Sequence, residues 1–145
     1  MDEPESIERF DTPQLEALVE IMVLAASADG EFSDEERQRL RTSVLTLTSR
    51  RLSPERIDPL LNGLERRIAS EGRAARLATV RAALGSPASR RVALDLALQV
   101  MAADGVLRTS ERELVLDIAV ALEIDPNEAA DMVRRAVESM ERRPT

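Results

Sequence analysis

The stretch ADGEFSDEER at residues 28–37 returns in altered form as ADGVLRTSER at residues 103–112. Both copies contain Ala-Asp-Gly followed by Glu-Arg, the Asp and the Glu are seven residues apart in each, and the copies begin 75 positions apart. Internal similarity at a fixed period indicates how many structural units a fold contains. The chain is therefore predicted to consist of two related halves, each built around an Asp-Gly turn.

Helix boundaries around these turns are marked by capping residues, prolines and glycines. Four predicted helices open with a capping residue followed by proline, at Thr12-Pro13, Ser53-Pro54, Ser86-Pro87 and Asp125-Pro126. Capping boxes are predicted for Ser33 with Glu36 and for Asp125 with Glu128. The seven predicted helices cover approximately residues 13–28, 34–47, 54–70, 73–84, 87–103, 109–122 and 126–141. Pro59 should either kink the third helix or mark its true start.

The composition favours a single all-α domain. Of the 145 residues, 43% are hydrophobic, mostly Leu, Ala, Val, Ile and Met, and strong helix formers dominate. We expect a loose segment at residues 1–12, one domain at 13–141 and a tail at 142–145. Within the domain, the repeat halves are 13–70 and 87–141, related by a pseudo-twofold axis and joined by the short helix 73–84.

The residue types that are missing exclude several kinds of chemistry. The chain has no Cys, His, Tyr or Lys, and all 20 basic residues are Arg. A Cys or His nucleophile–base pair, a Schiff-base lysine and a Walker lysine are therefore excluded. A zinc site built on nitrogen or sulfur ligands is excluded as well. If a metal binds, its ligands are oxygen atoms, which favours Ca²⁺, Mg²⁺ or Mn²⁺.

Charge and hydropathy predict a soluble, cytoplasmic protein with no transmembrane segment. The N-terminus is acidic, unlike a secretory signal, and the longest apolar run, residues 21–26, is too short to span a bilayer. The net charge of −7 and the scarcity of aromatic residues, which are two Phe only, argue against nucleic-acid binding. Residues 1–36 hold twelve acids and one Arg, whereas residues 37–81 hold eleven Arg and four acids. These blocks are either solvated helix faces or a dipolar surface that docks a charged partner.

Four carboxylates in the two repeats form the candidate site: Asp29, Glu36, Asp104 and Glu111. The helical phase places each aspartate at the end of one apolar stripe and each glutamate at the head of the next. All four are therefore predicted to lie at the rim of the core, where a cation would relieve their mutual repulsion. Separate EF-hand loops are rejected, because two ligand positions in each loop, such as Ala25 in the first, lack the Asp or Asn that the motif requires.

A purely structural interpretation of the same residues stays open. Glu36 can close the capping box of Ser33, and the arginines that follow the two glutamates, Arg37 and Arg112, can pair with acids. Capping does not explain the second copy, because Arg108 stands three residues before Glu111 and cannot accept a backbone N–H bond. The aspartates also stand near helix C-termini, where a negative charge costs about 0.3–1 kcal/mol.

The segments ASADGEFSDEE at residues 26–36 and AADGVLRTSE at residues 102–111 resemble the two halves of the TerB-like (tellurite-resistance TerB) domain. The resemblance covers about residues 13–141 and implies an all-helical fold with an internal duplication. It also implies a non-enzymatic acidic module of stress and metal responses, in which the motif carboxylates are proposed metal ligands. Those roles would fall on Asp29, Glu36, Asp104 and Glu111.

Three functions are consistent with these features. The first is a module that binds a hard cation through the four carboxylates and docks a protein partner in a tellurite, metal or envelope stress response. This partner is either a free protein or a membrane-associated one. The second is a metal-free helical interaction domain. The third is a metal-dependent hydrolase, which would need a base and a substrate clamp beyond these acids. We expect no enzyme activity, no catalytic residue and no organic cofactor.

Overall fold

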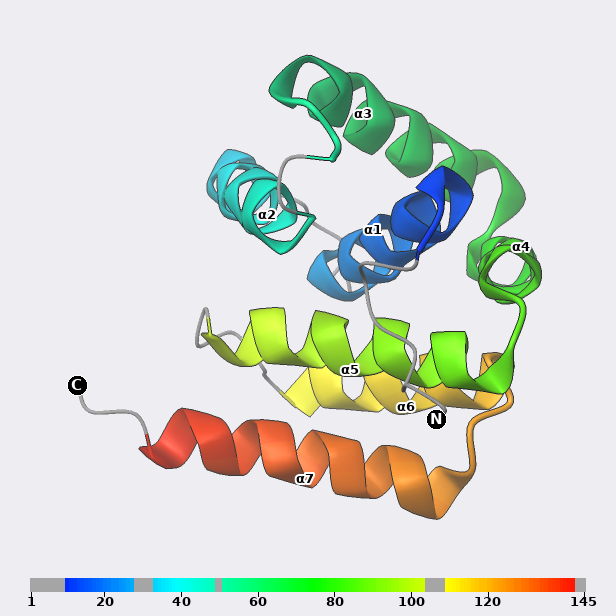
Figure 1. The fold of residues 1–145 in the computed structure, drawn as a ribbon, viewed down its shortest axis with the longest axis vertical. Coiled ribbons are helices and arrows are strands. Elements are labelled where there is room, and N and C mark those ends of the chain that lie inside the picture. The colour runs from blue at the N-terminus through cyan, green and yellow to red at the C-terminus, as the bar shows by residue number, and fades with distance from the viewer. Residues whose placement is uncertain (1–9, 28–32, 49–50, 104–108, 143–145) are drawn as a thin grey trace, which may run out of the picture.

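The structure is a computed structural model that describes residues 10–27, 33–48, 51–103 and 109–142. These residues form seven α-helices, which confirms the predicted all-α class (Figure 1). The helices are α1 (Thr12–Ala26), α2 (Asp34–Leu47), α3 (Pro54–Glu71), α4 (Arg73–Leu84), α5 (Pro87–Ala103), α6 (Thr109–Ala121) and α7 (Pro126–Arg142).

Helix α1 is the centre of the domain. It contacts α2, α3, α4, α5 and α6, and Figure 1 shows it between α3 above and the α5–α6 layer below. Leu15 and all nine residues from 17 to 25 are buried. The apolar stripe predicted for this helix is confirmed, since Leu15, Leu18 and Met22 are buried, and burial extends beyond it because neighbouring helices cover several sides of α1.

The first helix begins with a different cap from the one predicted. Asp11, not Thr12, is the N-cap: its Oδ1 accepts the backbone N–H of Gln14 at 2.9 Å. The side chain of Gln14 accepts the backbone N–H of Asp11 in return, also at 2.9 Å. Because this reciprocal pair satisfies two free donors, Thr12 is already helical and Pro13 occupies the first turn, where its missing N–H costs nothing.

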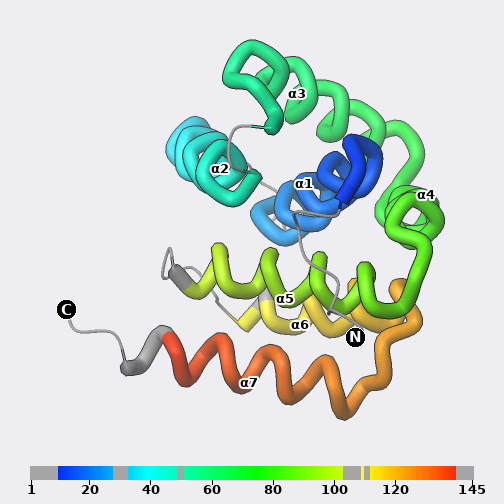
Figure 2. The backbone as a smooth tube through the Cα atoms, in the orientation of Figure 1, coloured from blue at the N-terminus to red at the C-terminus, as the bar shows by residue number. Residues whose placement is uncertain are grey.

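The boundaries of α3 and α4 follow local backbone chemistry. Helix α3 begins at Pro54, so Pro59 lies inside it and does not mark its start. Gly72 alone separates α3 from α4, with φ 89° and ψ 157°, a conformation that is essentially restricted to glycine. Figure 2 shows the resulting sharp turn, after which the chain passes through α4 into α5.

The helices that follow α4, which are α5, α6 and α7, form a layer of their own. Helix α7 packs against α5 and α6, and this layer lies below α1 in Figure 1. Helix α4 contacts α1, α3, α5 and α6 and so connects the two parts. The helix order on either side of α4 agrees with the predicted halves, whereas the pseudo-twofold relation between them stays a prediction.

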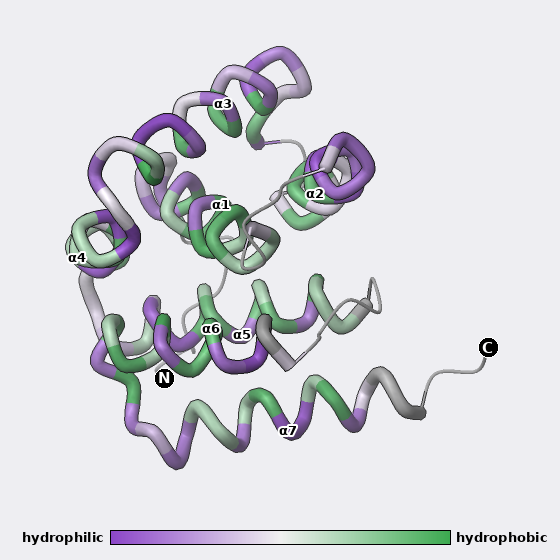
Figure 3. Tube along the Cα trace, turned by 180° about the vertical axis from the view of Figure 1, so that it is seen from behind, coloured by the Kyte–Doolittle hydropathy of each residue, from purple (hydrophilic) through white to green (hydrophobic). Residues whose placement is uncertain are grey.

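Helix α2 is the most polar of the four helices α1–α4. Only Leu40 and Val44 are buried along its length. Seen from behind in Figure 3, its hydrophobic residues face α1 and its hydrophilic residues face outward. The stripes predicted for α2 and for α6 are confirmed, because Val115 and Ile118 of α6 are also buried.

Candidate functional site

The structure describes the predicted carboxylate cluster only in part. Asp29 and Asp104 lie outside the described residues. Glu111 belongs to the first turn of α6, but its side chain also lies outside the described part. Glu36, in the first turn of α2, is the one predicted ligand whose side-chain contacts are described. Elsewhere in the described residues, no group of three or more acidic side chains is arranged to hold a metal ion.

The helix ends that flank the two Asp-Gly turns share one side of the domain. Helices α1 and α5 both end toward the side that carries α2, and α6 begins on that side, as the opposite views of Figures 1 and 3 both show. Ala26 and Ala103 are the last helical residues before the two turns.

Glu36 closes the capping box of α2, as one interpretation of the sequence predicted. Its Oε1 accepts hydrogen bonds from the backbone N–H and the hydroxyl of Ser33, both at 3.1 Å. The Ser33 hydroxyl in turn accepts the backbone N–H of Glu36 at 3.1 Å. These bonds engage one carboxylate oxygen, so the second oxygen of Glu36 can still bind a hard cation.

A buried ion pair between α1 and α4 is a contact that sequence reasoning missed. Glu20 of α1 and Arg76 of α4 are only 3% and 7% exposed. Arg76 Nε donates to Glu20 Oε2 at 2.6 Å and Nη2 donates to Oε1 at 2.8 Å, which makes the pair bidentate. The hydrogen bond with Glu20 raises the pKa of the Arg76 guanidinium, against the opposing effect of burial.

A third charge completes this group. Arg76 Nη1 donates to Glu71 Oε1 at 3.2 Å, at the end of α3. Glu20 and Arg76 line a hollow of about 180 Å³ between α1, α3 and α4, which Arg67 and Thr79 also line. The helical phase of α4 could have revealed Arg76, because it shares one face with the buried Leu77, Val80 and Leu84.

Two ion pairs hold α2 against α3. Arg37 forms one with Glu65. Arg41 Nε lies 3.4 Å from Asp58 Oδ1. One turn separates the two arginines on α2, so they meet the same side of α3. The prediction that Arg37 pairs with an acid is confirmed, and the acid lies 28 residues away on a neighbouring helix.

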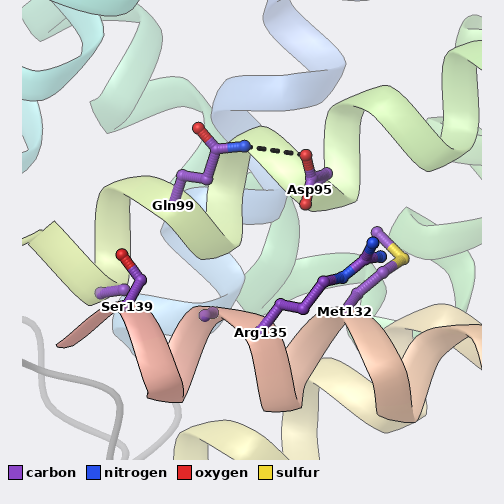
Figure 4. A pocket seen from close by; sticks show the side chains of 7 residues that line it. Asp95, Gln99, Met132, Arg135 and Ser139 are labelled. Carbon is purple, nitrogen blue, oxygen red and sulfur yellow. Dashed lines mark hydrogen bonds between the residues drawn. The ribbon is translucent and has the colours of Figure 1, made fainter. Parts of the chain in front are cut away.

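A groove of about 530 Å³ lies between α5 and α7 (Figure 4). Asp95 and Gln99 line it from α5, where the Gln99 amide donates to Asp95 Oδ2 at 2.8 Å. Arg135 and Ser139 line it from α7, with Met132 at one end. The groove is half open and mixes charged, amide and apolar groups.

The sequence matches the family model described as tellurite resistance protein TerB over residues 15–134, which is most of the chain. The chain belongs to the TerB family. The TerB match spans the end of α1, the head of α2 and the corresponding α5–α6 junction, so it includes both Asp-Gly turns. Searches of curated proteins and of solved structures gave no match. Within the described residues, this TerB chain has no helix that is long and apolar enough to cross a membrane.

Proposed function

We propose that the chain is a non-enzymatic TerB module that binds a hard divalent cation, Ca²⁺, Mg²⁺ or Mn²⁺, and docks a partner in a cytoplasmic tellurite, metal or envelope stress response. The ligands would be the carboxylates of Asp29, Glu36, Asp104 and Glu111. A bound cation would neutralise these acids and hold the two turns together. The protein's own contribution is to bring four oxygen ligands from two distant segments to one place.

The observation that carries this proposal is the common location of the helix ends around the two turns. Helices α1 and α5 end, and α6 begins, on one side of the domain, and the motifs that follow α1 and α5 are 75 residues apart in the sequence. Shared ligation needs such convergence, because neither turn has enough ligands for a site of its own. The donor set fits a hard cation, since it contains oxygen atoms only.

A metal-free interaction domain is the second candidate, and the contacts of Glu36 favour it. The capping box explains this glutamate without any ligand, because Glu36 and Ser33 satisfy each other's backbone donors. In that case the doubled motif organises helix ends only, and function resides in the charged helix faces.

Thermal unfolding with and without cations separates the two candidates. A ligand present at 100 times its Kd stabilises the folded state by about 2.7 kcal/mol. For a domain of this size, that corresponds to a rise in Tm of roughly 5–10 °C. We expect such a rise with millimolar Ca²⁺, Mg²⁺ or Mn²⁺ in a constant background of NaCl, and we expect Asp29→Asn with Asp104→Asn to abolish it.

The matched control removes two exposed acids from elsewhere, through Asp117→Asn with Asp131→Asn. Both double variants change the net charge from −7 to −5, so a general charge effect would alter them equally. A Tm that none of the three cations changes would refute cation binding and leave the metal-free interaction domain.

A further inference from the structure

Most acids of α3 pair with arginines of other helices, and the arginines of α3 itself form no ion pair with a described residue. The helix carries four carboxylates and three arginines, which suggests a balanced surface when the sequence is read alone. Three of the carboxylates are engaged by arginines from other helices, because Glu65 and Asp58 pair with α2 and Glu71 pairs with Arg76 of α4. Among the acids of this helix, only Glu55 forms no ion pair with a described residue.

The exposed arginines of α3 and of the start of α4 therefore outnumber Glu55, and this segment is positive on a protein whose net charge is −7. We call the exposed arginines of this segment, Arg56, Arg66, Arg67 and Arg73, the basic strip. All four arginines are exposed, and none of them forms an ion pair with a described residue. Arg73 also stands in the first turn of α4, where a cation is disfavoured by the helix dipole and gains from an external anion.

We propose that the basic strip docks an acidic polypeptide segment of a partner protein. This inference deepens the docking part of the proposed function and does not depend on cation binding. Arg56 and Arg66 are ten residues apart on one helix, so the strip is at least about 15 Å long. An extended chain crosses that distance in about five residues, which allows several carboxylates to reach the guanidinium groups at once.

The chemistry of the strip favours carboxylates on a polypeptide over a lipid surface. Every cation is an arginine, whose planar fork binds a carboxylate with two parallel hydrogen bonds. A helix that binds a membrane surface also needs large apolar side chains at the contact. The exposed large hydrophobic residues of the described part are Leu116 and Val120, and both belong to α6. The strip has none, so it is a linear electrostatic surface.

The hollow beside the strip adds a hydroxyl group, that of Thr79, to the charged groups of the strip. Arg67 and the Thr79 hydroxyl line it, and the buried pair of Glu20 and Arg76 closes its inner side. Glu16 of α1 also lines the hollow. Its negative charge limits the strip on that side, so the acidic segment would follow α3 and not α1.

The test measures binding of a fluorescent twelve-residue poly-glutamate peptide by anisotropy. Arg66→Gln with Arg67→Gln should weaken binding at least tenfold, and raising the NaCl concentration from 0.05 to 0.3 M should weaken binding to the unaltered protein. Arg39→Gln with Arg135→Gln is the matched control, because it removes two exposed arginines outside the strip. Both double variants have a net charge of −9 instead of −7, and only the first should lose binding.

Further outcomes decide against the proposal. Equal loss in both variants, or no binding of the peptide at low salt, overturns it. Binding to vesicles with 30% phosphatidylglycerol, or to a DNA duplex, with no binding of the peptide, assigns the strip to a different class of partner and also overturns it. The cation experiment above has a separate readout, so either proposal can fail alone.

Discussion

Replacing Arg76 by methionine tests whether the buried ion pair holds α1 and α4 together. Methionine keeps most of the length of the side chain but removes all five N–H donors. Glu20, only 3% exposed, would lose both of its bonds to the guanidinium, at 2.6 and 2.8 Å. Glu71 would lose its bond as well, but its side chain is 45% exposed and water can replace the arginine.

The expected cost is large because the uncompensated charge stays buried. Removing one partner of a buried pair costs about 3–5 kcal/mol, which is a large part of the 5–15 kcal/mol that is typical for a whole domain. The Tm should fall by roughly 10–15 °C. Replacing both partners, through Glu20→Met with Arg76→Met, should restore most of the stability, because no buried charge is left without a partner.

Urea unfolding followed by far-UV circular dichroism measures these free energies, since the chain has no Trp or Tyr to serve as a fluorescent probe. Arg81→Met is the control, because it breaks an exposed pair with Glu123 at 3.0 Å and should cost about 0.2–1 kcal/mol. The reasoning is refuted if Arg76→Met costs no more than this control. It is also refuted if the double variant loses the sum of the two single losses, since the cycle would then show no coupling.

Three further predictions concern the backbone, the cap of α2 and pH. Gly72→Ala should cost about 1–3 kcal/mol in urea unfolding because of the positive φ of this residue. Gly63→Ala is the control: it lies inside α3 with open space around the added Cβ, so it should be neutral or stabilise by up to about 1 kcal/mol. The reverse order of the two effects would contradict the assignment of strain to Gly72. Ser33→Ala should cost about 1 kcal/mol, and an unchanged midpoint would show that the capping box with Glu36 contributes nothing. The free energy of unfolding should be constant between about pH 6 and pH 10, because the chain has no His, Cys, Tyr or Lys. The pKa of Arg76 is raised on folding, so its stabilising effect is complete below the ordinary pKa of arginine and is lost only at more alkaline pH. A change in stability above about 1 kcal/mol within that range would instead indicate a carboxyl group with a strongly raised pKa.

Local chemistry explains why most of the fold is predictable from the sequence. The start of α5 after Ser86 and the bounds of α4 between two glycines depend on a few neighbouring residues, and both predictions are confirmed. The cap of α1 was predicted one residue too late, because Thr12 and Asp11 are both good caps and only the reciprocal bond with Gln14 decides between them.

Contacts between distant helices are not predictable in this way. Glu20 and Arg76 are 56 residues apart, and nothing near Glu20 in the sequence identifies its partner. The pairing of Glu65 with Arg37 likewise depends on how α2 lies on α3. Of the candidate site, the sequence predicted the capping role of Glu36 correctly as one alternative, whereas ligation by the four carboxylates stays a prediction.

The enclosure of α1 constrains how the chain can fold as it leaves the ribosome. This helix is complete at residue 26, but α4, α5 and α6, which cover it, end at residues 84, 103 and 121. At about 5–20 residues per second, the last of these coverings is synthesised roughly 5–20 s after α1. During that interval an apolar segment lacks its native cover and is a binding site for a holding chaperone. Helix α1, which is buried along most of its length in the native state, is thus synthesised before all the helices that cover it.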